Sequence, residues 1–336
     1  MLEAGEQKER RMSEWAIRFA STGGPESLRY EEVRVGEPGE GEVRLRHTAI
    51  GVNFIDVYYR TGLYPVELPS PIGVEGAGVV EAVGAGVTEL AVGDRVAYCL
   101  GPLGSYSTAR LYPADRLLKL PDGVSDAQAA AIMLKGLTAW YLLHSTRRLQ
   151  PGETILVHAA AGGVGSLLTQ WARHLGARVI ATAGSDEKAE QARGNGADEV
   201  IHYRTEDVAA RVRELTDGAG VPVVYDSIGK DTWEGSLDAL ASRGLMVSYG
   251  NASGPAPAVT PLTLMNKGSL FLTRPTLGHY IARREELLAG ASALFHLVAD
   301  GVLQPRIGQR IPLADAAEAH RRLEARGTTG ATILEP

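Results

Sequence analysis

The sequence predicts a two-domain α/β protein in which a β-rich domain accompanies a doubly wound parallel sheet. Residues 153–183 have the pattern of a strand, a glycine-rich turn, a helix and a second strand, which together make one βαβ unit. Residues 14–133 contain short strand-like runs between turns and show no helical period, as in a partly open barrel. A chain of 336 residues is long enough to bury two cores.

The expected domain limits follow from these patterns. We assign residues 14–133 and 274–336 to the β-rich domain, residues 134–273 to the parallel-sheet domain, and residues 1–13 to a flexible leader.

Composition narrows the class of protein. Hydrophobic residues make up 44% of the chain and charged residues 22%, with a net charge of −6, which is typical of a globular protein. The acidic balance disfavours a nucleic-acid or anionic-membrane partner. The single cysteine, Cys99, excludes an intrachain disulfide and a cysteine-rich metal cage. Because no apolar run is long enough to span a membrane and no secretory signal opens the chain, we expect a cytoplasmic protein.

The central βαβ unit carries the strongest functional signal. A strand over residues 154–158 leads into the pattern Ala160-x-Gly162-x-x-Gly165, a helix with apolar spacing follows from Val164, and Gly176 ends it. Unpaired N–H groups and the positive end of the dipole at such a helix start favour a pyrophosphate. Gly162 allows the backbone to approach the phosphates, and Gly165 allows close packing of helix on strand. The turn therefore predicts a dinucleotide site that includes Gly163 and Val164.

The other elements are expected in regular alternation. Strands are expected at residues 15–19, 28–35, 42–50, 78–83, 95–98, 106–111, 177–183, 199–202, 221–225, 245–249, 269–273 and 331–334, the last returning to the first domain. Helices are expected over most of residues 122–144, at 237–240 with a stop at 243–244, once or twice within 280–303, and at 315–324. Residues 252–263 are expected to form a long loop.

Seven stretches resemble one family. Gly51-Val-Asn-Phe-Ile-Asp and Pro71-Ile-Gly-Val-Glu-Gly-Ala-Gly open two of them, and all seven follow the family's order: residues 51–65, 71–80, 133–141, 158–165, 224–229, 244–251 and 267–275. They resemble the zinc-free quinone oxidoreductases, the branch of the medium-chain dehydrogenase/reductase superfamily that includes zeta-crystallin. The resemblance implies a GroES-like first domain, a Rossmann second domain, NADPH as cofactor, and assembly as a homodimer or homotetramer.

Two positions depart from the zinc-dependent members of that superfamily. Those relatives carry a histidine just before Glu-Gly-Ala-Gly and a cysteine upstream, whereas this chain has Val74 and Asn53 there, and it lacks the four-cysteine lobe. Catalytic zinc needs three protein ligands of His, Cys or carboxylate type. Without this Lewis acid, alcohol oxidation is disfavoured, and reduction of an electron-poor acceptor is favoured.

The resemblance also suggests the residues near the chemistry. The segment Asn53–Tyr58, interpreted as a loop, is implied to contact the nicotinamide end through Phe54, Ile55 and Asp56. Asn53 and Tyr58 are the candidate catalytic residues, and Tyr58 or a bound water is the candidate proton donor. The alternative is a solvated surface loop in which Asn53 is a turn residue.

Cofactor selectivity is expected where the second strand of the βαβ unit ends. NAD enzymes place a carboxylate there, but this strand runs into Gly184 and Ser185, with Lys188 one helical turn further on and Tyr203 after the next strand. In the family, the matching Lys and Tyr bind the 2′-phosphate. We therefore expect NADPH, although Asp186 is a contrary residue, and a solvated Lys188 is the alternative.

Further cofactor contacts are expected at two places. Residues at the carboxyl ends of the later strands should line the rim of the site: Ser227, Ser248, Tyr249, Asn251 and Arg274. By resemblance, Lys135, Thr138, Tyr141 and Arg326 also reach the cofactor. For the first three the alternative is helix surface and packing, and for Arg326 it is a helix-end cation that complements the dipole.

The predicted function is NADPH-dependent reduction of quinones by hydride or single-electron transfer, without a metal. One alternative is an NADPH-dependent reductase of the C=C bond in alkenals, enones or enoyl thioesters with the same fold. An alternative of another class is a non-enzymatic protein that binds NADPH and RNA, which the acidic balance disfavours.

Overall fold

The computed structural model describes residues 13–325 and 327–336, so the predicted leader falls almost wholly outside the described residues, as does Arg326. Contacts along the chain divide it into two compact units. Unit 1 comprises the described residues up to Ala131, those from Gln309 through the helix that ends at Glu324, and Thr332–Pro336; unit 2 comprises Ile132–Gly308 and Gly327–Ala331. As limits of folding domains, the boundaries expected from the sequence stay a prediction.

Unit 1 is built on two sheets. A three-stranded sheet has the order β2-β1-β4, with β1 at Glu14–Phe19, β2 at Arg29–Val33 and β4 at Ser70–Pro71. A seven-stranded sheet has the order β15-β16-β3-β5-β6-β8, with β7 also paired to β3. Its strands are β3 (Glu42–Val52), β5 (Glu75–Val83), β6 (Arg95–Cys99), β7 (Ala109–Pro113), β8 (Leu118–Lys119), β15 (Ile307–Pro312) and β16 (Ala331–Glu335).

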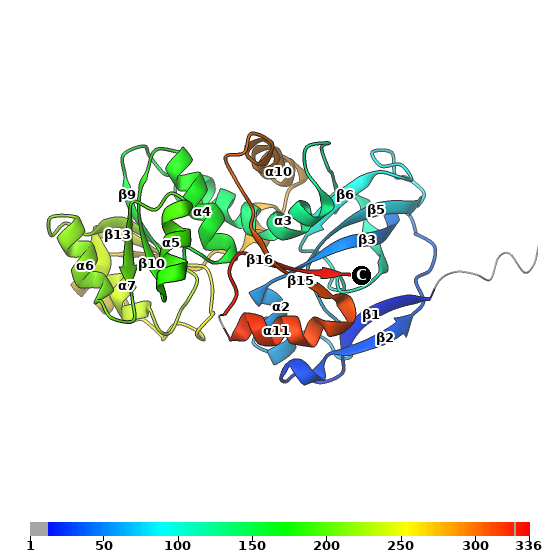
Figure 1. The fold of residues 1–336 in the computed structure, drawn as a ribbon, viewed down its shortest axis with the longest axis horizontal. Coiled ribbons are helices and arrows are strands. Elements are labelled where there is room, and N and C mark those ends of the chain that lie inside the picture. Colours follow the sequence, from blue (N-terminus) through cyan, green and yellow to red (C-terminus); the bar gives the residue numbers. More distant parts are fainter. Residues whose placement is uncertain (1–12, 326) are drawn as a thin grey trace, which may run out of the picture. The chain divides into compact units, whose positions relative to one another are not determined.

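The end of the chain returns to this unit, as expected. β16 pairs antiparallel with β3, and Ile333 lies opposite Gly51. Two helices, α2 (Phe54–Thr61) and α11 (Ala316–Glu324), lie next to each other in this unit (Figure 1). Ile17, Ile50, Leu334 and Ala319 share one apolar core, which therefore joins β1, β3, β16 and α11.

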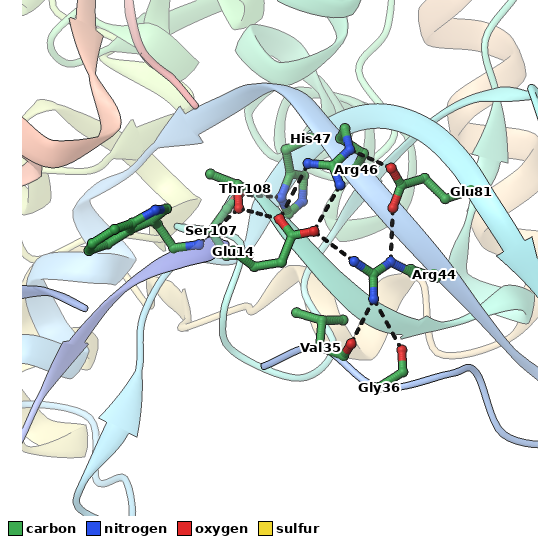
Figure 2. A network of polar contacts seen from close by, with 10 residues as sticks. Glu14, Val35, Gly36, Arg44, Arg46, His47, Glu81, Ser107 and Thr108 are labelled. Carbon is green, nitrogen blue, oxygen red and sulfur yellow. Dashed lines mark hydrogen bonds and ion pairs between the residues drawn. The ribbon is translucent and has the colours of Figure 1, made fainter. Parts of the chain in front are cut away.

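Figure 2 shows an ion-pair cluster that ties β1 to β3 and β5. The buried carboxylate of Glu14 accepts hydrogen bonds from Arg44 Nη2 at 2.6 Å, Arg46 Nη2 at 2.8 Å and Thr108 Oγ1 at 2.7 Å. Glu81 on β5 pairs with both arginines. Glu14 is buried, so removal of one of its arginine partners would leave part of its charge uncompensated and destabilise this unit.

Unit 2 is a doubly wound sheet of six parallel strands in the order β11-β10-β9-β12-β13-β14. The strands are β9 (Thr154–Val157), β10 (Arg178–Ala183), β11 (Glu199–His202), β12 (Val221–Asp226), β13 (Leu240–Ser248) and β14 (Phe271–Thr273). The helices of this unit, some of which flank the sheet in Figure 1, are α4 (Gly163–His174), α5 (Asp186–Gly194), α6 (Val208–Leu215), α7 (Trp233–Ala239), α8 (Pro261–Asn266), α9 (Leu277–Tyr280) and α10 (Arg284–Ala299).

The remaining helix is α3 (Asp126–Tyr141), which a π-helical turn extends over Leu142–Thr146; the division between the units falls inside it. Short 3-10 turns occur at Pro25–Ser27, Ala114–Arg116 and Leu313–Asp315. The predicted fold class, a β-rich domain with a doubly wound parallel sheet, is confirmed.

Three local predictions were wrong. The segment after Asn53 is helix α2 rather than a loop, because Asn53 and Asp56 cap its start and Gly62, with φ +81°, closes its end. Residues Leu240–Gly244 belong to strand β13 rather than to a helix with a glycine stop, since α7 ends at Ala239 and Leu240 pairs with Val221. The loop expected at 252–263 ends early, because Thr260 caps α8 and Pro261 starts it.

Candidate functional site

In the sheet of unit 2, a ligand is expected at the carboxyl ends of the parallel strands. Strand order reverses between β9 and β12, and ligands of doubly wound sheets bind beyond the carboxyl ends of the strands at that point. His158 follows β9 directly and Asp226 ends β12, so two polar side chains lie at the carboxyl ends of these neighbouring strands.

The turn between β9 and α4 is shaped for an anion. Gly162 is the N-cap of α4, and among the described residues no side chain caps this helix start, as suits a helix end that receives an anion. A methyl group at Gly165 would run into the carbonyl of Ala159 and lie 3.0 Å from Ala160 Cα, so only glycine permits this close packing.

A cation completes this cradle. A methyl group at Gly163 would lie 2.8 Å from Cδ of Lys135, so the side chain of this largely buried lysine passes directly over the helix start. Gly330, from the segment before β16, also meets the turn through a bridge with Gly162. The positive end of α4 and the ammonium group together suit a pyrophosphate, so the residues present fit a dinucleotide.

A buried hydrogen-bond network supports the turn from below. Ser236 Oγ donates to Asp226 Oδ2 at 2.7 Å, so the same hydroxyl accepts from His158 Nε2 at 2.9 Å. Nδ1 of His158 then accepts from Thr182 Oγ1 at 3.1 Å. Burial lowers the pKa of His158, in agreement with a neutral ring. This arrangement resembles a Ser-His-Asp triad in composition only, because the Ser236 hydroxyl is fully buried and donates to the carboxylate.

Asp226 ties the next loop to this network. Its Oδ1 accepts from the N–H groups of Ile228 at 2.7 Å and Gly229 at 3.1 Å, and its Oδ2 accepts from Thr232 Oγ1 at 2.6 Å. Burial alone would raise the pKa of Asp226, but hydrogen bonds from Thr232, Ser236 and the N–H of Gly229 hold it below its usual value. The loops after β9 and β12 are therefore joined by one ionised carboxylate.

The tip of β10 lacks a carboxylate and is lined by small residues. A methyl group at Gly184 would lie 2.8 Å from Cζ of Tyr203, which places the exposed phenol ring against the tip. Ser185 caps α5 by accepting from the N–H of Lys188 at 3.4 Å. The exposed carboxylate of Asp186 lies 3.6 Å from Nδ1 of His202. The Ser185 hydroxyl and the Tyr203 phenol thus lie at the tip where a 2′-phosphate is expected, and Lys188 is in the first turn of the helix that follows.

The other predicted cofactor residues of unit 2 follow three strands or lie on α3. Ser227 follows β12, Ser248 ends β13, and Tyr249 comes directly after it. The side-chain amide of Asn251 forms two hydrogen bonds in the orientation that satisfies both its atoms. Its oxygen accepts from Arg274 Nη2 at 3.2 Å, and its nitrogen donates to the Gly250 carbonyl at 3.0 Å.

The two other predicted residues of α3 are buried. Thr138 donates to the Leu134 carbonyl at 2.7 Å, and the Tyr141 ring stacks on Tyr280 with centroids 4.4 Å apart. Both contacts agree with the packing alternative for these two residues.

In unit 1 the start of α2 holds Asn53 firmly. Its backbone N–H donates to Asp56 Oδ2 at 2.9 Å, and its Nδ2 donates to Glu75 Oε2 at 2.7 Å. All three side chains are buried, so Glu75 on β5 orients the side-chain amide of Asn53, and Asp56 on α2 fixes its backbone. Phe54 and Ile55, next along the helix, are half-buried.

Tyr58 lies inside a group of aromatic rings. Its ring centroid is 5.2 Å from that of Tyr64 and 6.3 Å from that of Phe54, and 8% of the residue is exposed. This burial limits the access of Tyr58 to solvent, and its role as proton donor stays a prediction.

The carboxylate of Asp56 continues into a longer network. Tyr106 Oη donates to Asp56 Oδ2 at 2.9 Å and lies 3.1 Å from Nε2 of His320 on α11. Nδ1 of His320 is 3.1 Å from Arg60 Nη1, and Arg60 pairs with Glu324 at 2.7 Å. Burial and the Arg60 charge lower the pKa of His320 to about 3.

Sequence reasoning missed most of these supporting residues. His158 and Asp226 had a usable signal, since polar residues directly after buried strands face the ligand edge of the sheet. Tyr106 and His320 had none, because they are 214 residues apart in sequence.

A catalytic zinc ion does not fit the residues present. Val74 has no ligating atom, and Nδ2 of Asn53 is already bonded to Glu75. Within residues 13–325 and 327–336, no group of three or more His, Cys, Asp or Glu residues could hold a metal ion. We therefore derive no chemical step from a metal.

Two family models match the chain, and they agree with the two units. An alcohol dehydrogenase GroES-like domain matches residues 39–122, and a zinc-binding dehydrogenase model matches residues 163–293. The fold and the dinucleotide cradle thus define a medium-chain dehydrogenase/reductase.

The relatives define the branch. A quinone oxidoreductase of Pseudomonas aeruginosa is 58% identical over 95% of this chain and 99% of its own length. A 2-haloacrylate reductase of a Burkholderia species is 51% identical over 94% of this chain and 96% of its own. The crystal structure of Escherichia coli quinone oxidoreductase complexed with NADPH has a TM-score of 0.94 and 49% identity, covering 96% of this chain and 100% of that chain. The chain belongs to the zinc-free quinone oxidoreductase family.

No helix among the described residues is long and apolar enough to cross a membrane.

Proposed function

We propose that this protein is an NADPH-dependent quinone oxidoreductase that works without a metal. One observation carries the proposal: a dinucleotide cradle at α4 occurs in a chain whose zinc-ligand positions hold Asn53 and Val74. A hydride donor without a Lewis acid requires an acceptor that is already electron-poor, and a quinone is such an acceptor. The P. aeruginosa and E. coli relatives, both named quinone oxidoreductases, support this choice.

The selection of NADPH over NADH rests on the tip of β10. Small residues at Gly184 and Ser185 leave room for a 2′-phosphate, and Lys188 and Tyr203 supply a cation and a hydroxyl for it. In an NAD enzyme a carboxylate would occupy this tip and bond the ribose instead. The NADPH-complexed relative supports the same cofactor.

The bound cofactor supplies a hydride from its reduced nicotinamide ring. In unit 2, α4 and Lys135 would hold the pyrophosphate; in unit 1, Asn53 and its neighbours on α2 are the residues that we propose for the nicotinamide end. Quinone reduction takes up one hydride and one proton, and Tyr58 or a bound water is the proposed proton source. Positioning and exclusion of water, rather than acid–base groups, supply most of the rate enhancement.

A second candidate is reduction of a conjugated C=C bond. The 51% identity with a 2-haloacrylate reductase favours it, because an electron-poor alkene accepts hydride under the same conditions as a quinone.

A comparison of acceptors separates the two functions. NADPH oxidation is followed with 1,4-benzoquinone, 2-chloroacrylate and an enone, each with and without a chelator. Turnover that is fastest with the quinone and indifferent to the chelator supports the proposal. Turnover on the alkenes alone would assign the chain to the C=C reductases, and sensitivity to the chelator would contradict metal-free chemistry.

We also propose that the enzyme is a cytoplasmic homodimer, with β14 of two copies at the interface. β14 ends the strand order of its sheet, and Phe271 on it is 62% exposed. Leu262 and Met265 on α8 are exposed as well. An unpaired strand edge with exposed apolar side chains is a site for pairing between chains.

Sedimentation tests the dimer. Phe271→Asp should convert a dimer to monomers, whereas Leu288→Asp on the exposed face of α10 should leave the mass unchanged. A monomeric wild-type protein at micromolar concentration would contradict the proposal.

A further inference from the structure

A continuous set of buried polar side chains links α11 to Asn53, the N-cap residue of α2. From the helix α11 side it runs through Glu324, Arg60, His320, Tyr106 and Asp56 to the N–H of Asn53. Only Glu324, whose side chain is 34% exposed, is substantially open to solvent. Such a set is costly to bury unless its hydrogen bonds are mutually satisfied, so its geometry is strongly fixed.

The direction of each hydrogen bond follows from the chemistry of the groups. Asp56 Oδ2 accepts from Tyr106 Oη, so the single phenol proton is used there. Tyr106 Oη must therefore accept from Nε2–H of His320, and Nδ1 of this neutral ring accepts from Arg60 Nη1. From Arg60 through His320 and Tyr106 to Asp56, each group donates to the next, so this part of the set has one consistent arrangement of protons.

Such a chain of hydrogen bonds could either transfer protons or hold a fixed geometry. The group at the end remote from Asn53 decides between these two roles. A proton path needs a final group that gives up its proton and regains it from solvent. Here the donor behind His320 is the guanidinium of Arg60, which stays protonated and is further held by Glu324 at 3.0 Å and 2.7 Å. The set is therefore unsuited to supplying protons and suited to holding a fixed geometry.

The group that it holds is Asn53. The N-cap of α2 is fixed on one side by Asp56 at 2.9 Å and on the other by Glu75 at 2.7 Å. A shift of Asp56 would turn the N-cap and with it the amide that the function proposed above places beside the nicotinamide ring. We propose that Tyr106, His320 and Arg60 are positioning residues that set the orientation of Asn53; the proposal rests on the proposed function.

A double-mutant cycle tests this inference. Tyr106→Phe removes only the hydroxyl, and Asn53→Ala removes the group that it is proposed to position. If Tyr106 acts through Asn53, Tyr106→Phe should lower kcat for benzoquinone on the order of tenfold in the wild-type background and should change it little further in the Asn53→Ala background. The KM for NADPH should change less than twofold, since the phosphate cradle lies in unit 2.

A second readout of the same cycle needs no acceptor. The fluorescence of bound NADPH reports on the surroundings of its nicotinamide ring, and Tyr106→Phe should change the emission only where Asn53 is present. A wild-type enzyme without quinone turnover would refute the proposed function, while this fluorescence cycle would still decide the positioning role.

A control separates positioning from stability. Glu14→Gln disturbs the buried ion-pair cluster of Figure 2, which lies in the same unit. Among the described residues, this cluster shares no hydrogen bond with the set that ends at Asn53. It should lower Tm and leave kcat within twofold of the wild type. If Tyr106→Phe fails to fold, Glu324→Gln at the half-exposed end of the set replaces it in the cycle. Additive losses in kcat, or an unchanged kcat and emission in Tyr106→Phe, would overturn the inference.

Discussion

Ala159 has a left-handed backbone conformation, with φ +52°, in the cofactor turn two residues after β9 ends. This conformation costs a residue with a side chain about 1–2 kcal/mol, and glycine adopts it without that cost. Two hydrogen bonds hold Ala159 in place: its N–H donates to Thr182 Oγ1 at 3.4 Å and its carbonyl accepts from Gly162 at 2.8 Å. The strain is therefore imposed by the turn.

We expect Ala159→Gly to stabilise the protein by about 1 kcal/mol, because the relief of strain exceeds the extra chain entropy of glycine. Urea unfolding of both proteins measures this. Ala160→Gly is the matched control, since Ala160 is fully buried outside the left-handed region, and it should destabilise the protein. Destabilisation by Ala159→Gly would contradict the interpretation.

At the residue scale, a role could be predicted from the sequence where a residue belongs to a short local motif in which its type has one common function. Gly162 and Gly165 could be assigned to the turn because the neighbouring strand and helix were visible in the pattern around them. Glu75, Tyr106 and His320 could not be assigned, because their contacts join segments that are remote in sequence. The functional roles of the predicted site residues stay predictions.

Helix α2 shows how an element can be missed. The pattern Asn53-x-x-Asp56 followed by Gly62 is a complete set of start and stop signals for a helix. The segment is only 8 residues long and rich in aromatic residues, so the helical period was too short to be recognised. α7 was misplaced for a related reason, since Leu240 to Gly244 continues into a strand whose bulge interrupts the alternation of side chains.

Asp226 connects β12, the loop after it and α7, so its replacement tests that connection. We expect Asp226→Asn to destabilise the protein by about 1–3 kcal/mol, because an amide nitrogen would face hydroxyl and N–H donors that now bond to carboxylate oxygens. The free energy of unfolding in urea gives the magnitude.

The matched control is Asp238→Asn, at the last turn of α7. Its side chain is 51% exposed and pairs with Lys267 at the surface, so the change should stay within about 0.5 kcal/mol. Equal effects of the two substitutions would show that Asp226 does not connect these elements.

At the scale of the whole molecule, three buried histidines make stability depend on pH. Burial and the Arg110 charge lower the pKa of His47 to about 3, burial and Arg60 do the same for His320, and burial lowers the pKa of His158. The ordinary pKa is 6.5, so below that pH the unfolded chain binds protons that the folded chain does not.

Stability is therefore fully present above pH 6.5 and should be lost as the pH falls toward about 3. Each histidine contributes a slope of up to about 1.4 kcal/mol per pH unit. The carboxyl group of Glu14 adds to the loss only below its ordinary pKa of 4.5: burial would raise its pKa, but bonds from Arg46 and Thr108 lower it. Urea unfolding at pH 7, 6, 5 and 4 measures the slope.

Substitution of one histidine identifies its share. His47→Gln should reduce the slope of the unfolding free energy between pH 6 and 4 by the contribution of about one proton, about 1.4 kcal/mol per pH unit. The reason is that the unfolded chain then has one fewer group to protonate. A slope that His47→Gln does not alter would contradict the neutral, buried state of this ring.

At this scale, most of the architecture could be predicted. The alternation of strands and helices dictated a doubly wound sheet, and the return of residues 331–334 to the first domain is confirmed by the pairing of β16 with β3. Strand β15 was not predicted, because its exposed and half-buried residues lack the clear alternation of a half-buried strand.

The most direct test of the central claim is the ratio of kcat/KM for NADPH to that for NADH, measured with 1,4-benzoquinone as acceptor. A phosphate held by Lys188 and Tyr203 at the tip of β10 should make this ratio at least about tenfold, since hydrogen bonds to charged groups contribute about 1.5–3 kcal/mol each. Such a ratio with sustained quinone turnover is the predicted result. A ratio near one, a preference for NADH, or no turnover on the quinone would contradict the account.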